Sequence, residues 1–138
     1  MNDVPRLQVL VADDARVMRM LLRTMLNRVV HADVVEANDG PTALKCATAQ
    51  VFDLVFLDIN MPYMNGLTVL DSLRHTPEYR DRPIVMLTAL GQERHRARGL
   101  ALGASAYMLK PLREMELVRT LMKLVPEALA RRDARTGR

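Results

Sequence analysis

The sequence lacks most residues that cross-link a chain, stack on bases or enter a membrane. Its 138 residues include one cysteine and no tryptophan, and aromatic residues make up only 4%. The single cysteine, Cys46, excludes an internal disulfide and a four-cysteine zinc site, and fits a reducing compartment. No apolar run approaches the roughly 18 residues that a membrane span needs, and the short polar stretch 1–6 lacks the pattern of a secretory signal. We therefore expect a cytoplasmic protein that does not bind membranes.

The excess positive charge is concentrated at the C-terminal end of the chain. Twenty basic and 16 acidic residues give a net charge of +4. Residues 131–138 contribute +3 of it, from Arg131, Arg132, Arg135 and Arg138 against Asp133. Because aromatic side chains for base stacking are scarce, we expect no direct nucleic-acid partner. We interpret the basic tail as a solvated chain end.

The length and the 49% hydrophobic content fit one globular domain. Five short apolar segments predict β-strands over 7–12, 33–36, 54–57, 84–87 and 107–109. Helical spacing between them predicts five helices over 15–28, 40–49, 66–74, 92–102 and 112–129. Three of the strands are apolar without alternation, which is typical of parallel strands covered on both faces. This alternation predicts a three-layer α/β domain over 1–125, with the end of the last helix and the basic tail over 126–138.

Polar residues stand where the predicted strands end. The first strand is followed by Asp13 and Asp14, the third by Asp58, the fourth by Thr88 and the fifth by Lys110. In an open parallel sheet the carboxyl ends of the strands form one edge, where ligands bind. We therefore expect three carboxylates, a hydroxyl and an ammonium group in one small pocket.

Three adjacent carboxylates repel one another, and a divalent cation relieves the repulsion. Hard oxygen ligands favour Mg²⁺. We predict that Asp14 holds the metal, that Asp13 assists through water, and that Asp58 and the backbone carbonyl of Asn60 supply further oxygens.

A lysine and a threonine at the rim of such a site suit a phosphoryl group. Asp58 can act as the nucleophile and form an aspartyl phosphate. Lys110 and Thr88 can then bind the phosphoryl oxygens, as phosphoryl transfer requires.

Each of these residues has an ordinary structural interpretation when taken alone. Asp13 or Asp14 can cap the following helix, and Asp58 can form a turn before Asn60. Thr88 is a common strand residue and Lys110 a common surface charge. Four coincidences at four strand ends are far less probable than one, which favours a site.

The same residues carry a resemblance to a known family. The chain resembles the receiver domain of two-component response regulators, and within that family the stand-alone, CheY-like type. The resemblance spans about 7–125, and its motifs are VADD at 11–14, LDINMPYMNG at 57–66, LTA at 87–89 and GASAYMLKP at 103–111. It implies a flavodoxin-like fold with a five-stranded parallel sheet in the order 2-1-3-4-5 and five helices. That strand order rests on the resemblance alone.

The resemblance also implies a mechanism. A histidine kinase or histidine phosphotransfer protein donates a phosphoryl group to Asp58 with Mg²⁺, and Thr88 and Tyr107 then move as a switch. A downstream protein reads the change on the face formed by the fourth helix, fifth strand and fifth helix. The Lys110–Pro111 bond is expected to be cis. Such a protein is no enzyme in the usual sense, because it catalyses only its own phosphorylation and dephosphorylation.

Two features bear on partners and on the lifetime of the phosphorylated state. Leu90 stands where CheY-like proteins have an acidic residue, and an apolar side chain there should change water access to the acyl phosphate. Basic residues group in two helices, one set being Arg94, His95, Arg96 and Arg98, the other Arg16, Arg19 and Arg23. The first set fits an acidic partner and the second the phosphodonor, or both are solvated helix faces.

Other functions fit the sequence less well. A phosphatase with an aspartate nucleophile needs an acid two residues on, where this chain has Asn60. A flavin module needs a glycine-rich and hydroxyl-rich loop where Asp13 and Asp14 stand. No helix-turn-helix pattern follows the domain. The alternatives left open are the receiver portion of a longer transcriptional regulator, or a phosphate sink or relay intermediate. We expect a monomer, with dimerisation on phosphorylation as the other case.

Overall fold

In the computed structural model, residues 6–89 and 94–129 are described. Five parallel strands form one sheet in the order β2-β1-β3-β4-β5, which confirms the expected order. Their bounds are β1 Leu7–Ala12, β2 Ala32–Ala37, β3 Leu54–Asp58, β4 Ile84–Thr88 and β5 Ala106–Leu109. The α-helices are α1 Arg16–Val29, α2 Gly40–Ala49, α3 Gly66–Arg74, α4 Arg94–Leu102 and α5 Glu114–Leu124.

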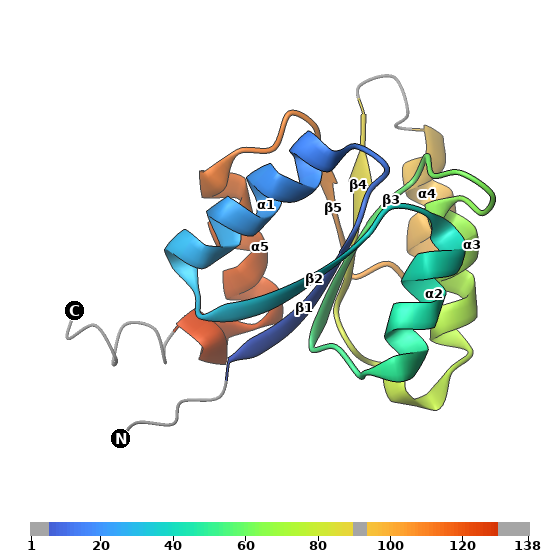
Figure 1. The fold of residues 1–138 in the computed structure, drawn as a ribbon, viewed down its shortest axis with the longest axis horizontal. Helices are drawn as coiled ribbons and strands as arrows, with labels where there is room; N and C mark the ends of the chain where they lie inside the picture. Colours follow the sequence, from blue (N-terminus) through green and yellow to red (C-terminus); the bar gives the residue numbers. More distant parts are fainter. Residues whose placement is uncertain (1–5, 90–93, 130–138) are drawn as a thin grey trace.

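The helices cover both faces of the sheet, so the domain has three layers. Helices α1 and α5 lie on one face, and α2, α3 and α4 lie on the other (Figure 1). One buried cluster joins the sheet to Leu22 and Leu26 of α1 and to Leu117 and Leu121 of α5. A second cluster, on the opposite face, includes Ala43 of α2 and residues of α3. The central strands are apolar without alternation because both of their faces are buried.

Two elements differ from the sequence prediction. The predicted helix over 112–129 is shorter: α5 ends at Leu124, Val125 leaves the helical region with φ of −138°, and residues 126–129 form a separate helical turn. Pro126 explains the break, because a proline disfavours helical geometry in the residue before it. A short 3₁₀ helix, η1 (Pro77–Tyr79), was not predicted.

The remaining elements agree with the prediction to within a residue or two. α2 and α3 have the predicted bounds. Residues 92 and 93 of the predicted fourth helix, Leu90, and the basic tail at 131–138 lie outside the described residues. Within the described part of the chain, no helix is long and apolar enough to cross a membrane.

Candidate functional site

Strand register brings the predicted site residues to one edge of the sheet. Ala12 of β1 pairs with Leu57 of β3, so Asp13 and Asp58 each lie one residue further along neighbouring strands. In the same way Thr88 pairs with Leu109, and Lys110 follows at the end of β5. Backbone hydrogen bonds extend these ladders past the strand ends, from Lys110 N to Thr88 O at 2.8 Å. The Lys110–Pro111 peptide is cis, as the resemblance implies.

Lys110 lies between two buried carboxylates at this edge. Its Nζ is 3.0 Å from Asp58 Oδ1, to which it donates a hydrogen bond, and 2.8 Å from Asp13 Oδ2. Asp13 is fully buried and Asp58 is 4% exposed. The ammonium group therefore serves two acids at once, and one positive charge does not neutralise both.

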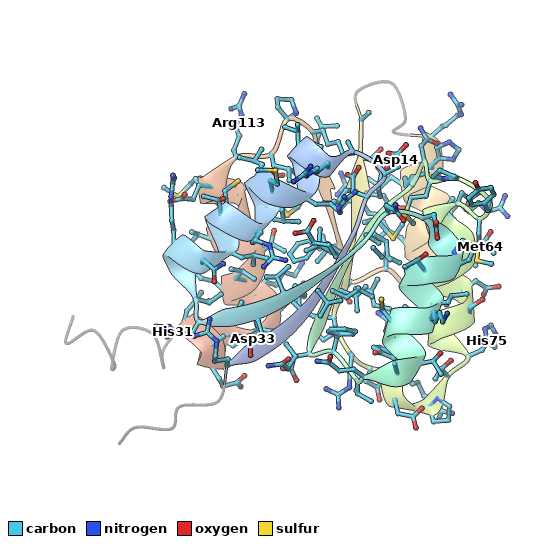
Figure 2. The ribbon with its side chains drawn as sticks, viewed as in Figure 1. Asp14, His31, Asp33, Met64, His75 and Arg113 are labelled. Carbon is cyan, nitrogen blue, oxygen red and sulfur yellow. The ribbon has the colours of Figure 1, made fainter. Side chains whose placement is uncertain are left out.

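Asp14 completes an acidic cluster with Asp13 and Asp58. One carboxylate oxygen from each residue lies within 4.8 Å of the others. Figure 2 shows Asp14 in the loop after β1, where it is exposed. With Lys110 included, the four groups carry a formal charge of −2 when all are ionised.

The cluster fits a divalent cation. Asp13 Oδ2 is buried, and its contact with Lys110 has the distance of an ion pair but not the geometry of a hydrogen bond, so it has no hydrogen-bond partner among the described residues. A buried carboxylate oxygen without such a partner is costly. Hard oxygen ligands and a surplus of negative charge match what Mg²⁺ takes.

The surroundings shift the pKa values of Asp58 and Lys110. Burial raises the pKa of Asp58 from 3.8 to about 6, with a further rise from the charge of Asp13 and a partial offset from Lys110. Burial lowers the pKa of Lys110, but its close contacts with the carboxylates of Asp13 and Asp58 outweigh burial and raise the pKa above its ordinary value of 10.5. Lys110 therefore stays charged at neutral pH, whereas Asp58 loses its proton near pH 6.

Two backbone contacts hold Asp13 in place. Its Oδ1 accepts a hydrogen bond from Ala15 N at 2.9 Å, and its carbonyl accepts one from Arg19 Nη1 at 2.7 Å. Ala15, not an aspartate, is the N-cap of α1, and no side chain caps that helix. The capping interpretation of Asp13 and Asp14 is therefore not what the structure shows.

The basic residues of α1 are largely engaged within the fold. Arg19 Nε lies 2.8 Å from Glu36 Oε1, and Arg23 Nη2 lies 2.8 Å from Glu36 Oε2. The Arg19 side chain is only 13% exposed. Two of the three arginines in the predicted stripe thus brace α1 against β2, which counts against a free basic stripe for a phosphodonor.

Thr88 and Asn60 lie at the same edge of the sheet, but their side chains make fewer and longer contacts than that of Lys110. Thr88 is 5% exposed, and its hydroxyl donates a long hydrogen bond of 3.4 Å to Ala89 O. Asn60 is exposed, two residues after Asp58. Neither side chain forms a hydrogen bond with the side chain of Lys110 or of Asp58 among the described residues, so the roles of Thr88 and Asn60 at the site stay predictions.

Tyr107 connects β5 to α4. Its hydroxyl donates a hydrogen bond to His95 O at 2.9 Å, and the Arg96 guanidinium lies 6.0 Å from the centre of its ring. The ring is half-buried and packs against the cluster that contains α3. Burial also raises the pKa of the hydroxyl. The predicted switch tyrosine is therefore seated against the helix that the resemblance assigns to the output face.

The lack of a side chain at Gly99 leaves room for Tyr107 to pack against α4. A Cβ atom at this buried position would lie 1.6 Å from the Tyr107 hydroxyl and 2.6 Å from its Cζ. Real carbon–oxygen contacts do not approach so closely, so a side chain at 99 must displace the tyrosine. The sequence alone did not point to Gly99, because the contact depends on how α4 lies over β5.

We expect Gly99→Ala to destabilise the protein by displacing Tyr107 from His95 O. Overpacking of this kind costs about 1–3 kcal/mol. In a Tyr107→Ala background the same substitution should instead stabilise by up to about 1 kcal/mol, because alanine favours helix over glycine. Urea unfolding of the four proteins tests this, and destabilisation of equal size in both backgrounds would show that Tyr107 is not the obstacle.

Gly66 packs directly against the backbone of Asp58, the candidate nucleophile. A Cβ at Gly66 would lie 2.1 Å from the Asp58 carbonyl oxygen, and Gly66 N donates to Ile59 O at 2.8 Å. The N-terminus of α3 therefore packs directly on the backbone of the β3 end. Asn65 caps this helix by accepting a hydrogen bond from Thr68 N at 3.0 Å.

Comparison with known proteins identifies the family. The model of the response regulator receiver domain matches residues 9–122, and the chain belongs to this family. It is 39% identical over 132 residues to the response regulator PleD of Caulobacter vibrioides, and 40% identical over 111 residues to the transcriptional regulatory protein CpxR of Escherichia coli. These matches cover 92% and 80% of this chain. The chain spans only 29% of the length of PleD and 46% of CpxR.

The solved structures that are similar to this chain belong to the same family. Chemotaxis protein CheY4 of Vibrio cholerae has a TM-score of 0.80 and 30% identity, covering 88% of this chain and all of its own. The receiver domain of the sensor histidine kinase PA1611 of Pseudomonas aeruginosa, with a magnesium ion coordinated in its active-site cleft, has a TM-score of 0.80 and 26% identity. That match covers 88% of this chain and 99% of the other. The chain is thus a CheY-like receiver domain, and the family acts as a phosphoacceptor switch in two-component signalling rather than as a conventional enzyme.

Proposed function

We propose that the chain is the phosphoryl-accepting switch of a two-component phosphorelay, with Asp58 as the acceptor. The observation that carries this is the position of Asp58. It is a nearly buried carboxylate at the sheet edge, with Lys110 Nζ 3.0 Å from one oxygen and two further acids beside it. Two further carboxylates at such short range repel an ionised Asp58, so they do not stabilise the fold and indicate a functional role instead.

In the proposed step, an Asp58 carboxylate oxygen attacks the phosphorus of a phosphohistidine donor. A phosphorus–oxygen bond forms, the phosphorus–nitrogen bond breaks, and the donor imidazole leaves with that electron pair and takes up a proton. Lys110, already aimed at Asp58, balances the charge that accumulates on the phosphoryl oxygens. Thr88, at the end of the neighbouring strand, offers a hydroxyl to the same group.

We propose that Asp13, Asp14, Asp58 and the carbonyl of Asn60 hold Mg²⁺. Bound there, the ion would neutralise the acidic cluster and the incoming phosphoryl oxygens. Asp13 Oδ2, which accepts no hydrogen bond from a described residue, and the three carboxylate oxygens within 4.8 Å of one another support this assignment, and so does the magnesium ion in the PA1611 receiver domain.

Return to the resting state requires hydrolysis of the aspartyl phosphate. Water attacks phosphorus and Asp58 leaves as a carboxylate, so the chain turns over only its own modification. Asn60, exposed and two residues after the acceptor, is one of the two positions that we expect to flank the path of that water. Leu90, at the other flanking position of the family site, lies outside the described residues.

We propose that the state of Asp58 is read on the face formed by α4, β5 and α5. Thr88 ends β4 beside β5, and Tyr107 on β5 bonds to the α4 backbone, so a contact from Thr88 to phosphate biases the packing of neighbouring elements. The donor would be a histidine kinase or histidine phosphotransfer protein in the cytoplasm. The receiver unit would span 1–125, with 126–138 as its C-terminal extension.

Acetyl phosphate with Mg²⁺ tests this function without a partner protein. We expect intact-mass spectrometry to show the gain of one phosphoryl group. The gain should disappear with EDTA, and separately in Asp58→Asn. A gain that survives Asp58→Asn would contradict the assignment of the acceptor.

A further inference from the structure

Arg19 of α1 connects the loop that carries two candidate metal ligands to the neighbouring strand β2. Its Nη1 donates a hydrogen bond to Asp13 O at 2.7 Å, and its Nε donates one to Glu36 Oε1 at 2.8 Å. Among the described residues, no other side chain donates to the backbone of residues 13–15. The planar guanidinium therefore fixes two oxygens, one after β1 and one on β2, relative to α1.

The Arg19 side chain is part of the packed structure and not a solvated charge. Only 13% of it is exposed, and Glu36 is 25% exposed. Burial raises the pKa of Glu36, but hydrogen bonds from Arg19 and Arg23 outweigh burial and hold that pKa below its ordinary value of 4.5. Glu36 is therefore ionised at neutral pH, and its charge-assisted hydrogen bond keeps the Arg19 guanidinium in place.

The loop that Arg19 holds has few other fixed points. Asp13 N donates to Ala37 O at 3.1 Å, and Asp13 Oδ1 accepts from Ala15 N within the loop itself. Asp14, labelled in Figure 2, is exposed, and its carboxylate forms no hydrogen bond or ion pair with a described residue. The position of the Asp14 carboxylate therefore depends on the loop backbone, which Arg19 anchors at the Asp13 carbonyl.

We propose that Arg19 is a positioning residue for the metal site. By holding the Asp13 carbonyl, it keeps the carboxylates of Asp13 and Asp14 where both can bind one Mg²⁺. Loss of a residue that orients metal ligands typically weakens metal binding by about 10–100-fold. The inference rests on the proposed function, because it takes the acidic cluster to be the Mg²⁺ site. It adds to that site a residue that does not touch the ion and has the same sign of charge.

Positioning and simple electrostatics predict opposite effects when Arg19 is lost. Arg19 places a positive charge beside the backbone of Asp13, so removing that charge alone would strengthen the binding of a cation. Removing the anchor weakens binding, because the loop must then be ordered when the ion binds. We expect the loss of the anchor to dominate, because Glu36, with Oε1 2.8 Å from Arg19 Nε, already offsets the charge.

Arg23 provides the matched control. It lies one turn further along α1, and its Nη2 is 2.8 Å from Oε2 of the same Glu36. The same Nη2 donates to Val34 O at 3.1 Å and not to the Asp13 loop. Arg23→Met therefore removes one positive charge and one partner of Glu36 but leaves Asp13 O bonded. Arg19→Lys keeps the charge but loses the planar fork that reaches both oxygens.

Calorimetric titration with Mg²⁺ at pH 8 measures the metal affinity of wild type and of the three variants. We expect Arg19→Met to weaken Mg²⁺ binding by about tenfold and Arg19→Lys by about threefold, whereas Arg23→Met should change it by less than about twofold. Urea unfolding in EDTA shows whether each variant is folded. If Arg19→Met is not, Arg19→Lys carries the test, because simple electrostatics predicts no change for it.

The rate of phosphoryl uptake gives a second readout. With acetyl phosphate, intact mass should show slower uptake in Arg19→Met than in wild type at low Mg²⁺. At saturating Mg²⁺ the two rates should converge, because the substitution changes how tightly the ion is held and leaves Asp58 and Lys110 in place.

Three results would overturn the inference. They are Mg²⁺ affinity that is unchanged or higher in the Arg19 variants, an equal loss of affinity in Arg23→Met, and a rate difference that persists at saturating Mg²⁺. The failure of the proposed metal site looks different. If wild type itself binds no Mg²⁺, that assignment is wrong and the inference falls with it; if wild type binds Mg²⁺ and the Arg19 variants bind it as tightly, the inference alone is wrong.

Discussion

Lys110→Ala should slow phosphoryl uptake at Asp58 by about a hundredfold or more while strengthening Mg²⁺ binding. Lys110 Nζ is the one described cation between Asp13 and Asp58, at 2.8 and 3.0 Å. Removing a preorganised donor to developing negative charge costs about 10²–10³ in rate. Removing a positive charge beside a cation site has the opposite effect on the metal, because the repulsion between two cations is lost.

The opposite directions of the two effects make this prediction sharp. Phosphoryl uptake is followed by intact mass over time with acetyl phosphate at saturating Mg²⁺. Metal affinity is measured by calorimetry at pH 8, where Asp58, with its pKa of about 6, is ionised in wild type. Lys45→Ala serves as the control for loss of a lysine elsewhere. If both quantities fall together, Lys110 has a structural role and not the electrostatic one assigned to it.

Asp58→Asn should stabilise the metal-free protein at pH 8. The pKa of Asp58 is raised by burial from 3.8 to about 6, so the folded state disfavours the ionised form. Below pH 3.8 the group is protonated in both states and imposes no penalty. As pH rises through the interval to about 6, the unfolded chain ionises first and folding loses stability, and above 6 the penalty is complete.

Each unit by which the pKa of Asp58 is raised on folding lowers the free energy of unfolding at high pH by up to about 1.4 kcal/mol. With solvent screening at the rim of the site, we expect Asp58→Asn to raise the free energy of unfolding by about 2 kcal/mol at pH 8 in EDTA. The gain should shrink strongly by pH 4. With Mg²⁺ present, wild type should become more stable than Asp58→Asn. A ligand that binds only the folded state stabilises the protein that retains the binding site.

Urea unfolding followed by circular dichroism, in EDTA at pH 8 and pH 4, measures the effect. Asp14→Asn is the matched control, because Asp14 belongs to the same cluster but is exposed. It should stabilise the protein less than Asp58→Asn does. Destabilisation by Asp58→Asn at pH 8 would mean that the Lys110 contact outweighs burial, and that the pKa of Asp58 is not raised.

The sequence predicted the site's central residues because they follow a rule of parallel sheets. Asp13, Asp58 and Lys110 end buried strands, and such ends share one edge once the strands are parallel. No knowledge of side-chain orientation was needed. That β1 and β3 are neighbours, which brings Asp13 close to Asp58, followed from the resemblance and not from the apolar runs.

What the sequence did not reveal depends on contacts between elements. Arg19 and Glu36 lie 17 residues apart, and nothing in their spacing indicates that they meet or that Arg19 also holds the Asp13 carbonyl. The close approach of Gly99 to Tyr107 likewise requires the position of α4 over β5. The early end of α5 is different, since Pro126 was visible and its effect on Val125 is a local rule.

Chemical mapping of the modified residue tests the central claim most directly. Treating the protein first with acetyl phosphate and Mg²⁺, then with borohydride, reduces an aspartyl phosphate to homoserine with loss of phosphate, and peptide mass spectrometry locates the product. The account predicts homoserine at position 58, and none when EDTA is present during phosphorylation. Homoserine at position 13 or 14 with an intact Asp58 would contradict it.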